Sequence, residues 1–183
     1  MTYRAVDLSR VRTYPLPKRH NRVALENLVM PGAPAPAFDS PDLEEAAHRI
    51  AAARLAGRPC IWMIGAHVVK RGLAPLLIDL MERGIITHLA SNGAATIHDF
   101  EIALQGSTSE DVASSLETGM FGMAEETGRL MNQAIRAGAQ EGLGIGEALG
   151  RLVAESGDFA YRQYSLLYTA YRLRIPYTVH VAL

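Results

Sequence analysis

The sequence has little of what several protein classes require. Cys60 is the single cysteine in 183 residues, so no disulfide framework and no multi-thiolate metal site can form within the chain, and a reducing, cytoplasmic setting is expected. The 18 basic and 19 acidic residues nearly cancel. Because binding to a phosphate backbone needs an excess of basic charge, nucleic acid is not an expected partner.

Long apolar runs are also absent. The apolar stretches are a few residues long and are broken by charges such as Lys70 and Asp79, far short of the roughly 20 residues that cross a bilayer. Residues 1–12 lack the apolar stretch of a secretory signal. We therefore expect neither a membrane span nor export. The 49% hydrophobic content suffices for a buried core, and the length favours one main domain.

The first 39 residues are predicted to form an irregular arm, and residues 40–183 the folded domain. Five prolines fix backbone angles and remove hydrogen-bond donors in the arm: Pro15, Pro17, Pro31, Pro34 and Pro36. A helix should follow, capped by Ser40 with Pro41 in its first position and ended by Gly57. Its apolar residues recur at helical spacing, so it is expected to lie on a sheet.

The middle of the chain predicts a strand, helix and strand. Cys60–Ile64 is wholly apolar, which is typical of a strand buried on both faces. A helical pattern runs over 69–82, although Pro75 favours a start nearer Gly72. A second strand is expected over 85–90. The spacing of about thirty residues is that of a right-handed crossover between parallel neighbours.

The remaining segments predict further helices and a last strand. Helical patterns cover 96–104, 120–137, 145–154 and 159–173, and alternation returns over 177–183. The fold class is thus α/β: a Rossmann-like parallel sheet with flanking helices. Ligands of such sheets bind beyond the carboxyl ends of the strands. Nothing follows the third strand, so we expect that a downstream segment completes the sheet and the site.

Two strand ends carry the candidate ligand loop. Gly65-Ala66-His67 follows the first strand, and Ser91-Asn92-Gly93 follows the second. Glycine allows a ligand to approach closely, and a helix amino terminus attracts phosphate, so the pyrophosphate of a nucleotide would fit. Neither loop has the full glycine fingerprint of dinucleotide-binding folds, and small residues also serve tight turns alone.

His98 and Asp99 lie near the start of the helix after this loop. Either residue could hydrogen-bond a ribose or a substrate amine, and either could simply cap and solvate the helix. Together with Glu101 they also suggest a metal-dependent hydrolase. No metal is expected, because the other histidines show no ligand spacing.

The segment from Ile61 to Leu104, IWMIGAHVVKRGLAPLLIDLMERGIITHLASNGAATIHDFEIAL, resembles the central part of the deoxyhypusine synthase family. It departs from that family in the order of Arg71 and Gly72. The loop ASNGAATIHDFE also resembles the archaeal and cyanobacterial ornithine cyclodeaminase group, which has a related NAD-binding fold. The closing RIPYTVHVAL stands where these proteins return to the sheet.

The resemblance implies an NAD-dependent enzyme acting on a small amine, either by aminobutyl transfer or by deamination. It implies a homotetramer and an NAD site that includes Gly65, Ala66, Ser91, Asn92, Gly93, His98 and Asp99. The catalytic lysine of the synthases would lie beyond residue 183, so no catalytic residue can be named. A nucleotide-binding regulatory or scaffold module without turnover is the alternative.

Overall fold

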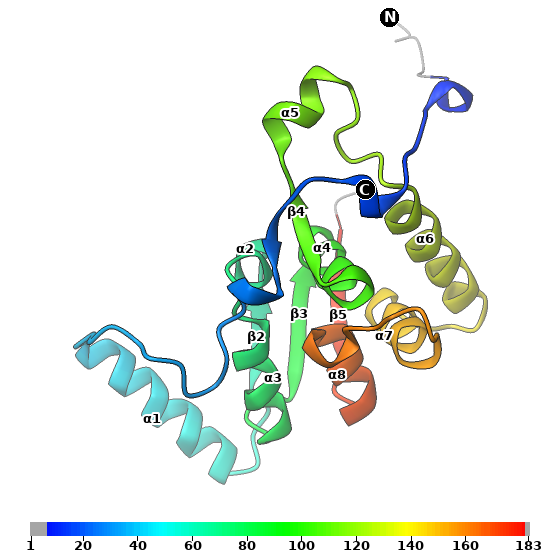
Figure 1. The fold of residues 1–183 in the computed structure, drawn as a ribbon. Helices are drawn as coiled ribbons and strands as arrows, with labels where there is room; N and C mark the ends of the chain where they lie inside the picture. Colours follow the sequence, from blue (N-terminus) through cyan, green and yellow to red (C-terminus); the bar gives the residue numbers. More distant parts are fainter. Residues whose placement is uncertain (1–6, 182–183) are drawn as a thin grey trace, which may run out of the picture.

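The computed structural model describes residues 7–181 (Figure 1). A parallel sheet of three strands lies at its centre, in the order β2 (Ile61–Ile64), β3 (His88–Asn92) and β5 (Tyr177–His180). Ile64 pairs with Ser91, and Ser91 pairs with Val179, so the carboxyl ends of all three strands lie level. The predicted α/β fold with a parallel, Rossmann-like sheet is confirmed, as is the pairing of its first two strands.

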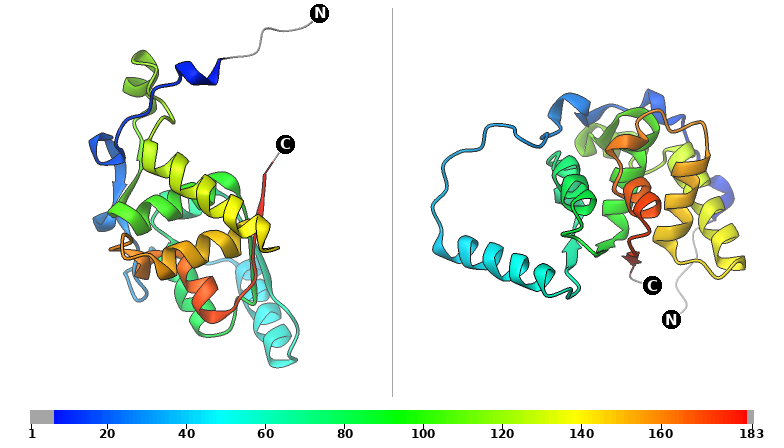
Figure 2. Two further views of the ribbon diagram at one scale, coloured as in Figure 1. Left: turned by 90° about the vertical axis from the view of Figure 1, so that its right-hand side faces the viewer. Right: turned by 90° about the horizontal axis from the view of Figure 1, so that it is seen from below.

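Most helices gather on one side of this sheet, and α1 stands apart from them (Figure 2). The helices are α1 (Pro41–Leu55), α2 (Ala66–Lys70), α3 (Ala74–Glu82), α4 (Gly93–Gln105), α5 (Val112–Glu117), α6 (Glu125–Gln140), α7 (Ile145–Glu155) and α8 (Leu166–Leu173). Short 3-10 turns lie at Leu8–Arg10, Leu16–Lys18, Leu25–Asn27 and Arg162–Tyr164. Within the described range, no helix is long and apolar enough to cross a membrane.

The crossover between β2 and β3 contains two helices where the pattern over 69–82 predicted one. Gly72 separates them with a φ of +75°, and a side chain there would stand 2.1 Å from the Asn27 carbonyl oxygen. Only glycine tolerates both conditions. Pro75 then sits in the first turn of α3, where its missing N–H costs nothing. The preference for a helix starting nearer Gly72 is confirmed.

Two expectations about burial were wrong. Helix α1 buries none of its residues, and Leu55 is 91% exposed, so it does not lie on the sheet. Much of its apolar pattern consists of alanines, which gain little from burial. Strand β2 is not buried on both faces either, since Ile61 and Met63 are 54% and 83% exposed. The helices cover only the opposite face, where Trp62 and Ile64 pack on the core.

A small second sheet joins the amino-terminal arm to the domain. Strands β1 (Asn21–Ala24) and β4 (Ser107–Glu110) pair antiparallel, with Val23 opposite Thr108. The arm was expected to be irregular, and β1 is a short regular element within it. Neither strand was predicted, because both are short and largely polar, which leaves no periodic apolar signal.

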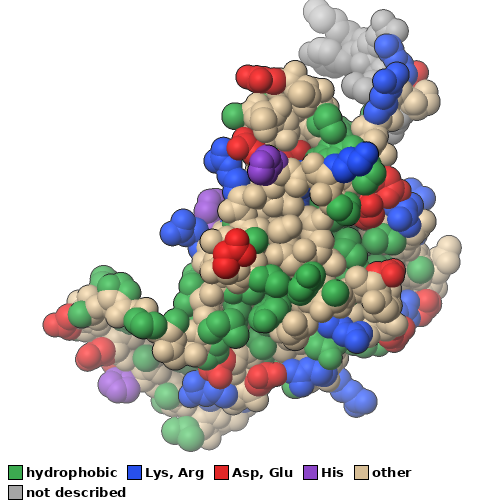
Figure 3. Space-filling view, in the orientation of Figure 1, with side chains coloured by type: hydrophobic (Ala, Val, Ile, Leu, Met, Phe, Trp, Pro, Cys, Tyr) green, Lys and Arg blue, Asp and Glu red, His purple; other side chains and the backbone are tan. Residues whose placement is uncertain are grey.

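The main hydrophobic core lies between the helices and the covered face of the sheet. It includes Leu89, Phe100, Leu149 and Leu167, and the rings of Phe100 and Phe159 meet edge to face at 5.1 Å. On the face seen in Figure 3, hydrophobic side chains cross the middle of the molecule, with charged side chains around them. Helix α4 runs through this core, and its other side borders the candidate site.

Candidate functional site

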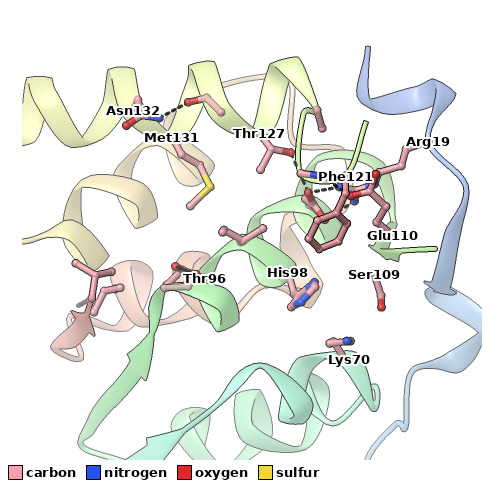
Figure 4. A pocket seen from close by; sticks show the side chains of 18 of the residues that line it. Arg19, Lys70, Thr96, His98, Ser109, Glu110, Phe121, Thr127, Met131 and Asn132 are labelled. Carbon is pink, nitrogen blue, oxygen red and sulfur yellow. Dashed lines mark hydrogen bonds and ion pairs between the residues drawn. The ribbon is translucent and has the colours of Figure 1, made fainter. Parts of the chain in front are cut away.

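A cleft of about 550 Å³ lies at the carboxyl end of the sheet (Figure 4). Its wall includes Gly93 at the start of α4, together with Val179 and Val181 from the end of β5 and beyond it. The volume is in the range typical of small-molecule sites. Ligands of open parallel sheets bind at this end of the strands, so the position agrees with the sequence-based expectation of a ligand beyond the strand ends.

A larger cavity, of about 730 Å³, opens beside the start of β5 and is lined by Arg172 and Arg174, among others. It borders Pro176 and Tyr177, at the amino-terminal end of that strand. Parallel sheets bind their ligands at the opposite end. We therefore take the smaller cleft as the functional candidate.

The cleft has an apolar part and a charged part. Its apolar wall comes from α4, α6, α7 and the end of β5: Ile97, Met131, Ile135, Ile145, Val179 and Val181. The charged part holds Arg19 from the arm, Lys70 from α2, and Glu101 and Glu110. Such a surface suits a ligand that combines a flat apolar portion with charged groups.

Glu101 is the centre of the charged part, although it is 1% exposed. Arg19 donates to both of its carboxylate oxygens, at 2.8 and 2.5 Å. The hydroxyl groups of Thr108 and Thr127 donate to it as well, at 2.5 and 2.9 Å. A buried carboxylate persists when its charge is paired and its lone pairs are filled. The network ties the arm, α4, β4 and α6 together.

His98 lies one turn before Glu101 and faces the cleft between Phe121 and Lys70 (Figure 4). Its Nδ1 is 2.8 Å from the Thr108 hydroxyl oxygen. Burial lowers the pKa of His98 below its ordinary value; the nearby Glu101 opposes this shift, and Lys70 supports it. The ring is therefore held neutral over a wider pH range than a free imidazole.

Asp99 is placed differently from the expectation. It is fully buried, and its carboxylate accepts hydrogen bonds from the Ser165 hydroxyl at 2.6 Å and from the amides of Leu166 and Leu167 at 2.7 and 3.0 Å. These groups form the start of α8. Burial raises the pKa of Asp99 to about 6, against the effect of the three hydrogen bonds. Its geometry supports the capping alternative, for α8 rather than for its own helix, and not contact with a ligand.

The other predicted site residues fall around the strand ends. Gly65 and Asn92 are neighbours, since a side chain on Gly65 would lie 3.9 Å from the Asn92 amide nitrogen. Asn92 caps α4 by accepting from the Ala95 amide at 3.0 Å. Ser91 is buried and bonds the Tyr177 hydroxyl at 3.0 Å. Of the seven residues, Gly93 and His98 line the cleft.

Gly65 and Ala66 begin the turn into α2, and they are partly buried beside the cleft rather than in its wall. The structure thus brings the two strand ends side by side as expected, but it places the open volume along α4. The ligand-facing side of that helix starts at Gly93 and continues through Ile97 and His98.

Several residues of the cleft were missed from the sequence. Arg19 lies 82 positions from its partner Glu101, and nothing local marks an arginine in a proline-rich arm as part of a site. Glu101 stands three positions after His98 and so shares a helix face with it; it was named beside His98 as a possible metal carboxylate, but not as the partner of an arginine. Lys70 was noted only as a charge that breaks an apolar run, yet it lines the cleft.

Metal binding receives no geometric support. Among residues 7–181, no group of three or more His, Cys, Asp or Glu side chains is arranged to hold an ion. Asp99 points into the core and His98 is bonded to Thr108. The pair suggested by the sequence is therefore divided between two environments.

Comparison with known proteins shows similarity of fold. No family model and no curated protein sequence matches the chain. ArgZ, an arginine dihydrolase from the ornithine-ammonia cycle in cyanobacteria, has a TM-score of 0.52 and 20% identity over 80% of this chain and 19% of its own. Unliganded AgrE has a TM-score of 0.53 and 19% identity over 81% of this chain and 20% of its own.

AgrE has also been solved with ornithine and NAD+, and that structure has a TM-score of 0.48 and 20% identity over 81% of this chain and 21% of its own. The chain therefore spans about a fifth of the length of these proteins. At this identity, ArgZ and unliganded AgrE show that the α/β arrangement of the chain occurs in solved structures.

Proposed function

We propose that the chain is an NAD-binding domain of an enzyme that acts on a small amino acid or amine. The cleft carries this proposal: it lies at the carboxyl end of a parallel sheet, next to the amino terminus of α4, and combines an apolar wall with Lys70. Helix amino termini hold amides without intrahelical acceptors, and they favour phosphate.

The residues present fit a dinucleotide. Gly93 leaves room at the start of α4, where a Cβ would already stand 3.0 Å from the Val181 side chain. Lys70 supplies a cation for a phosphate, and Ile97 and Met131 offer an apolar surface for a ring. When bound, NAD would supply hydride chemistry, and the protein's part would be to hold the reacting groups in a dry pocket.

The substrate class rests on two kinds of support. Glu110 lines the charged part of the cleft, and a carboxylate there suits an ammonium group. The fold likeness to ArgZ, which acts on arginine, favours amino-acid chemistry over aminobutyl transfer of the deoxyhypusine synthase type. Deamination of the ornithine cyclodeaminase type is the reaction we favour within this class.

Calorimetric titration with NAD+ tests the cofactor. The chain has two lysines, Lys70 in the cleft wall and Lys18 exposed in the arm, which gives a matched pair of variants. We expect Lys70→Gln to weaken binding about tenfold, or about 1.4 kcal/mol, and Lys18→Gln to leave it unchanged. If both variants bind NAD+ as tightly as the parent protein, NAD+ does not bind in this cleft.

A regulatory or scaffold module would bind NAD+ in the same way but would not turn it over. Release of ammonia from L-ornithine and other amines in the presence of NAD+ measures turnover, because cyclising deamination of ornithine leaves no net NADH. Binding without turnover in the full-length protein would favour the module.

We also propose that the chain assembles with copies of itself. The open face of β2, where Met63 and Ile61 are exposed, supports this, because exposed apolar surface of this kind is often covered by a partner. Light scattering after size-exclusion chromatography measures the mass, and a Met63→Lys variant should lower it. A monomeric parent protein would contradict the proposal.

A further inference from the structure

The hydrogen bonds beneath the cleft determine where the proton of His98 lies. Thr108 is fully buried, and its hydroxyl donates to a Glu101 carboxylate oxygen at 2.5 Å. A hydroxyl has one proton to donate. Toward His98, whose Nδ1 is 2.8 Å away, Thr108 therefore offers only a lone pair. His98 must donate from Nδ1, and its Nε2 then carries the free lone pair.

The orientation of Thr108 is itself fixed by the charge of Glu101. Arg19 and Thr127 donate to the carboxylate of Glu101, and a carboxylate paired with a guanidinium accepts hydrogen bonds and donates none. The alternative in which Thr108 donates to His98 would leave a buried carboxylate oxygen facing a hydroxyl lone pair. The network therefore selects one tautomer of the ring.

The Nε2 atom of His98 has no hydrogen-bond partner within residues 7–181, and the residue lines the cleft. The charged and titratable groups that face the ring are Glu101 on its own helix, Lys70 and His67 on α2, and Arg19 of the arm. Burial, Lys70, Arg19 and His67 disfavour a charged ring, and Glu101 favours it. A neutral imidazole with an exposed lone pair is the form that accepts a proton.

We propose that His98 is a proton acceptor of the cleft, acting through Nε2 on an ammonium group of the bound ligand. The proton moves from the ligand nitrogen to Nε2, and the electron pair stays on that nitrogen. The Nδ1–H bond to Thr108, supported by Glu101, then stabilises the imidazolium. Thr108 and Glu101 are positioning residues in this arrangement. The role rests on the proposed function, because it requires an amine in this cleft.

Nuclear magnetic resonance of the imidazole nitrogens tests the tautomer without any ligand. The His98 signals are assigned by comparison with His98→Gln. At neutral pH we expect Nδ1 to be protonated and Nε2 to be unprotonated. Thr108→Val should reduce this tautomer, and Thr108→Ser should restore it. A charged ring, or a proton on Nε2, in the parent protein would overturn the proposal whether or not NAD+ binds.

The acceptor role is then tested by adding 1,4-diaminobutane, with and without NAD+. The expected result is a displacement of the Nε2 signal as an ammonium group of the diamine donates a hydrogen bond to it, at least threefold smaller in Thr108→Val than in Thr108→Ser. A correct tautomer with an Nε2 signal unmoved by the diamine under both conditions would overturn the proposal. Failure of NAD+ to bind in the calorimetric titration would instead reject the proposed cofactor, so the two failures can be told apart.

Discussion

The two sides of helix α4 use acidic residues in opposite ways. On the core side, Asp99 is closed in by the start of α8 and meets no open volume. On the cleft side, Glu101 is equally buried, but its network leads through Thr108 to His98 at the cleft wall. Both carboxylates stabilise the fold by joining distant segments. Only the second is connected to a place where a ligand can bind.

The comparison teaches that burial of a charged group does not identify a site by itself. What separates the two residues is the partner at the far end of each network. We expect substitutions on both sides to lower the free energy of unfolding. Only those on the cleft side should also change ligand binding.

The largest expected effect is that of Glu101→Gln. The change leaves the Arg19 guanidinium without its buried counter-charge, so we expect a loss of about 3 kcal/mol in the free energy of unfolding. Urea denaturation followed by circular dichroism measures it. Adding Arg19→Met should recover more than half of the loss, and simple additivity of the two changes would contradict the pairing.

Asp99→Ala should cost about 2 kcal/mol, because it leaves buried donors at the start of α8 without an acceptor. Asp79→Ala is the control, since Asp79 forms an exposed pair with Arg83 on α3 and should cost less than about 0.5 kcal/mol. In the folded protein, Asp99→Ala should leave NAD+ affinity unchanged. Weaker NAD+ binding by a fully folded Asp99→Ala variant would indicate that Asp99 takes part in the binding site after all.

Gly93→Val should reduce NAD+ affinity about tenfold, or about 1.4 kcal/mol, because its side chain fills the start of the cleft beside Val181. Gly157→Ala, at a position with no atom near the added Cβ, is the control and should bind as the parent does. Calorimetry measures both. Parent-like binding by Gly93→Val would place the ligand elsewhere.

The smallest effect is on the pH dependence of stability, where the two sides should have opposite signs. The lowered pKa of His98 means that the unfolded chain binds more protons below about pH 6.5, so stability falls as the pH falls through this window. The pKa of Asp99 is raised to about 6. The folded chain therefore binds more protons between its ordinary pKa and 6, and stability falls as the pH rises through that range.

Denaturation curves measured from about pH 4 to about pH 8 cover the titration ranges of both residues. They separate the effect of His98 on stability from that of Asp99. His98→Gln should remove the loss on the acid side, and Asp99→Asn should remove the loss toward neutral pH. Unchanged pH profiles for both variants would show that neither group has the expected shift.

The sequence predicted the sheet well because parallel strands and crossover helices leave local signals. The apolar run at Ile61–Ile64, the strand from Tyr177 and a helix that starts after Gly72 all leave signals in residues close to one another in the chain. The exposed face of β2 could not be predicted, because an apolar strand looks the same whether one face or both are covered.

The site was predicted only in part. Strand-end glycines and His98 carry local signals of a ligand loop, and the structure places Gly93 and His98 in the cleft wall. Asp99 has the same local signal, but the start of α8, more than sixty positions later, determines its role. Arg19 depends on a contact 82 positions away. Such pairings follow from the fold and leave no trace in residue spacing.

The most direct test of the central claim, that the cleft beside α4 binds NAD+, is a map of amide chemical-shift changes during NAD+ titration. We predict that the affected amides cluster at Gly93–His98, at Lys70 and at Val179–Val181. Changes that cluster instead at Arg172–Arg174, beside the other cavity, or no changes at millimolar NAD+ in the folded protein, would contradict the account.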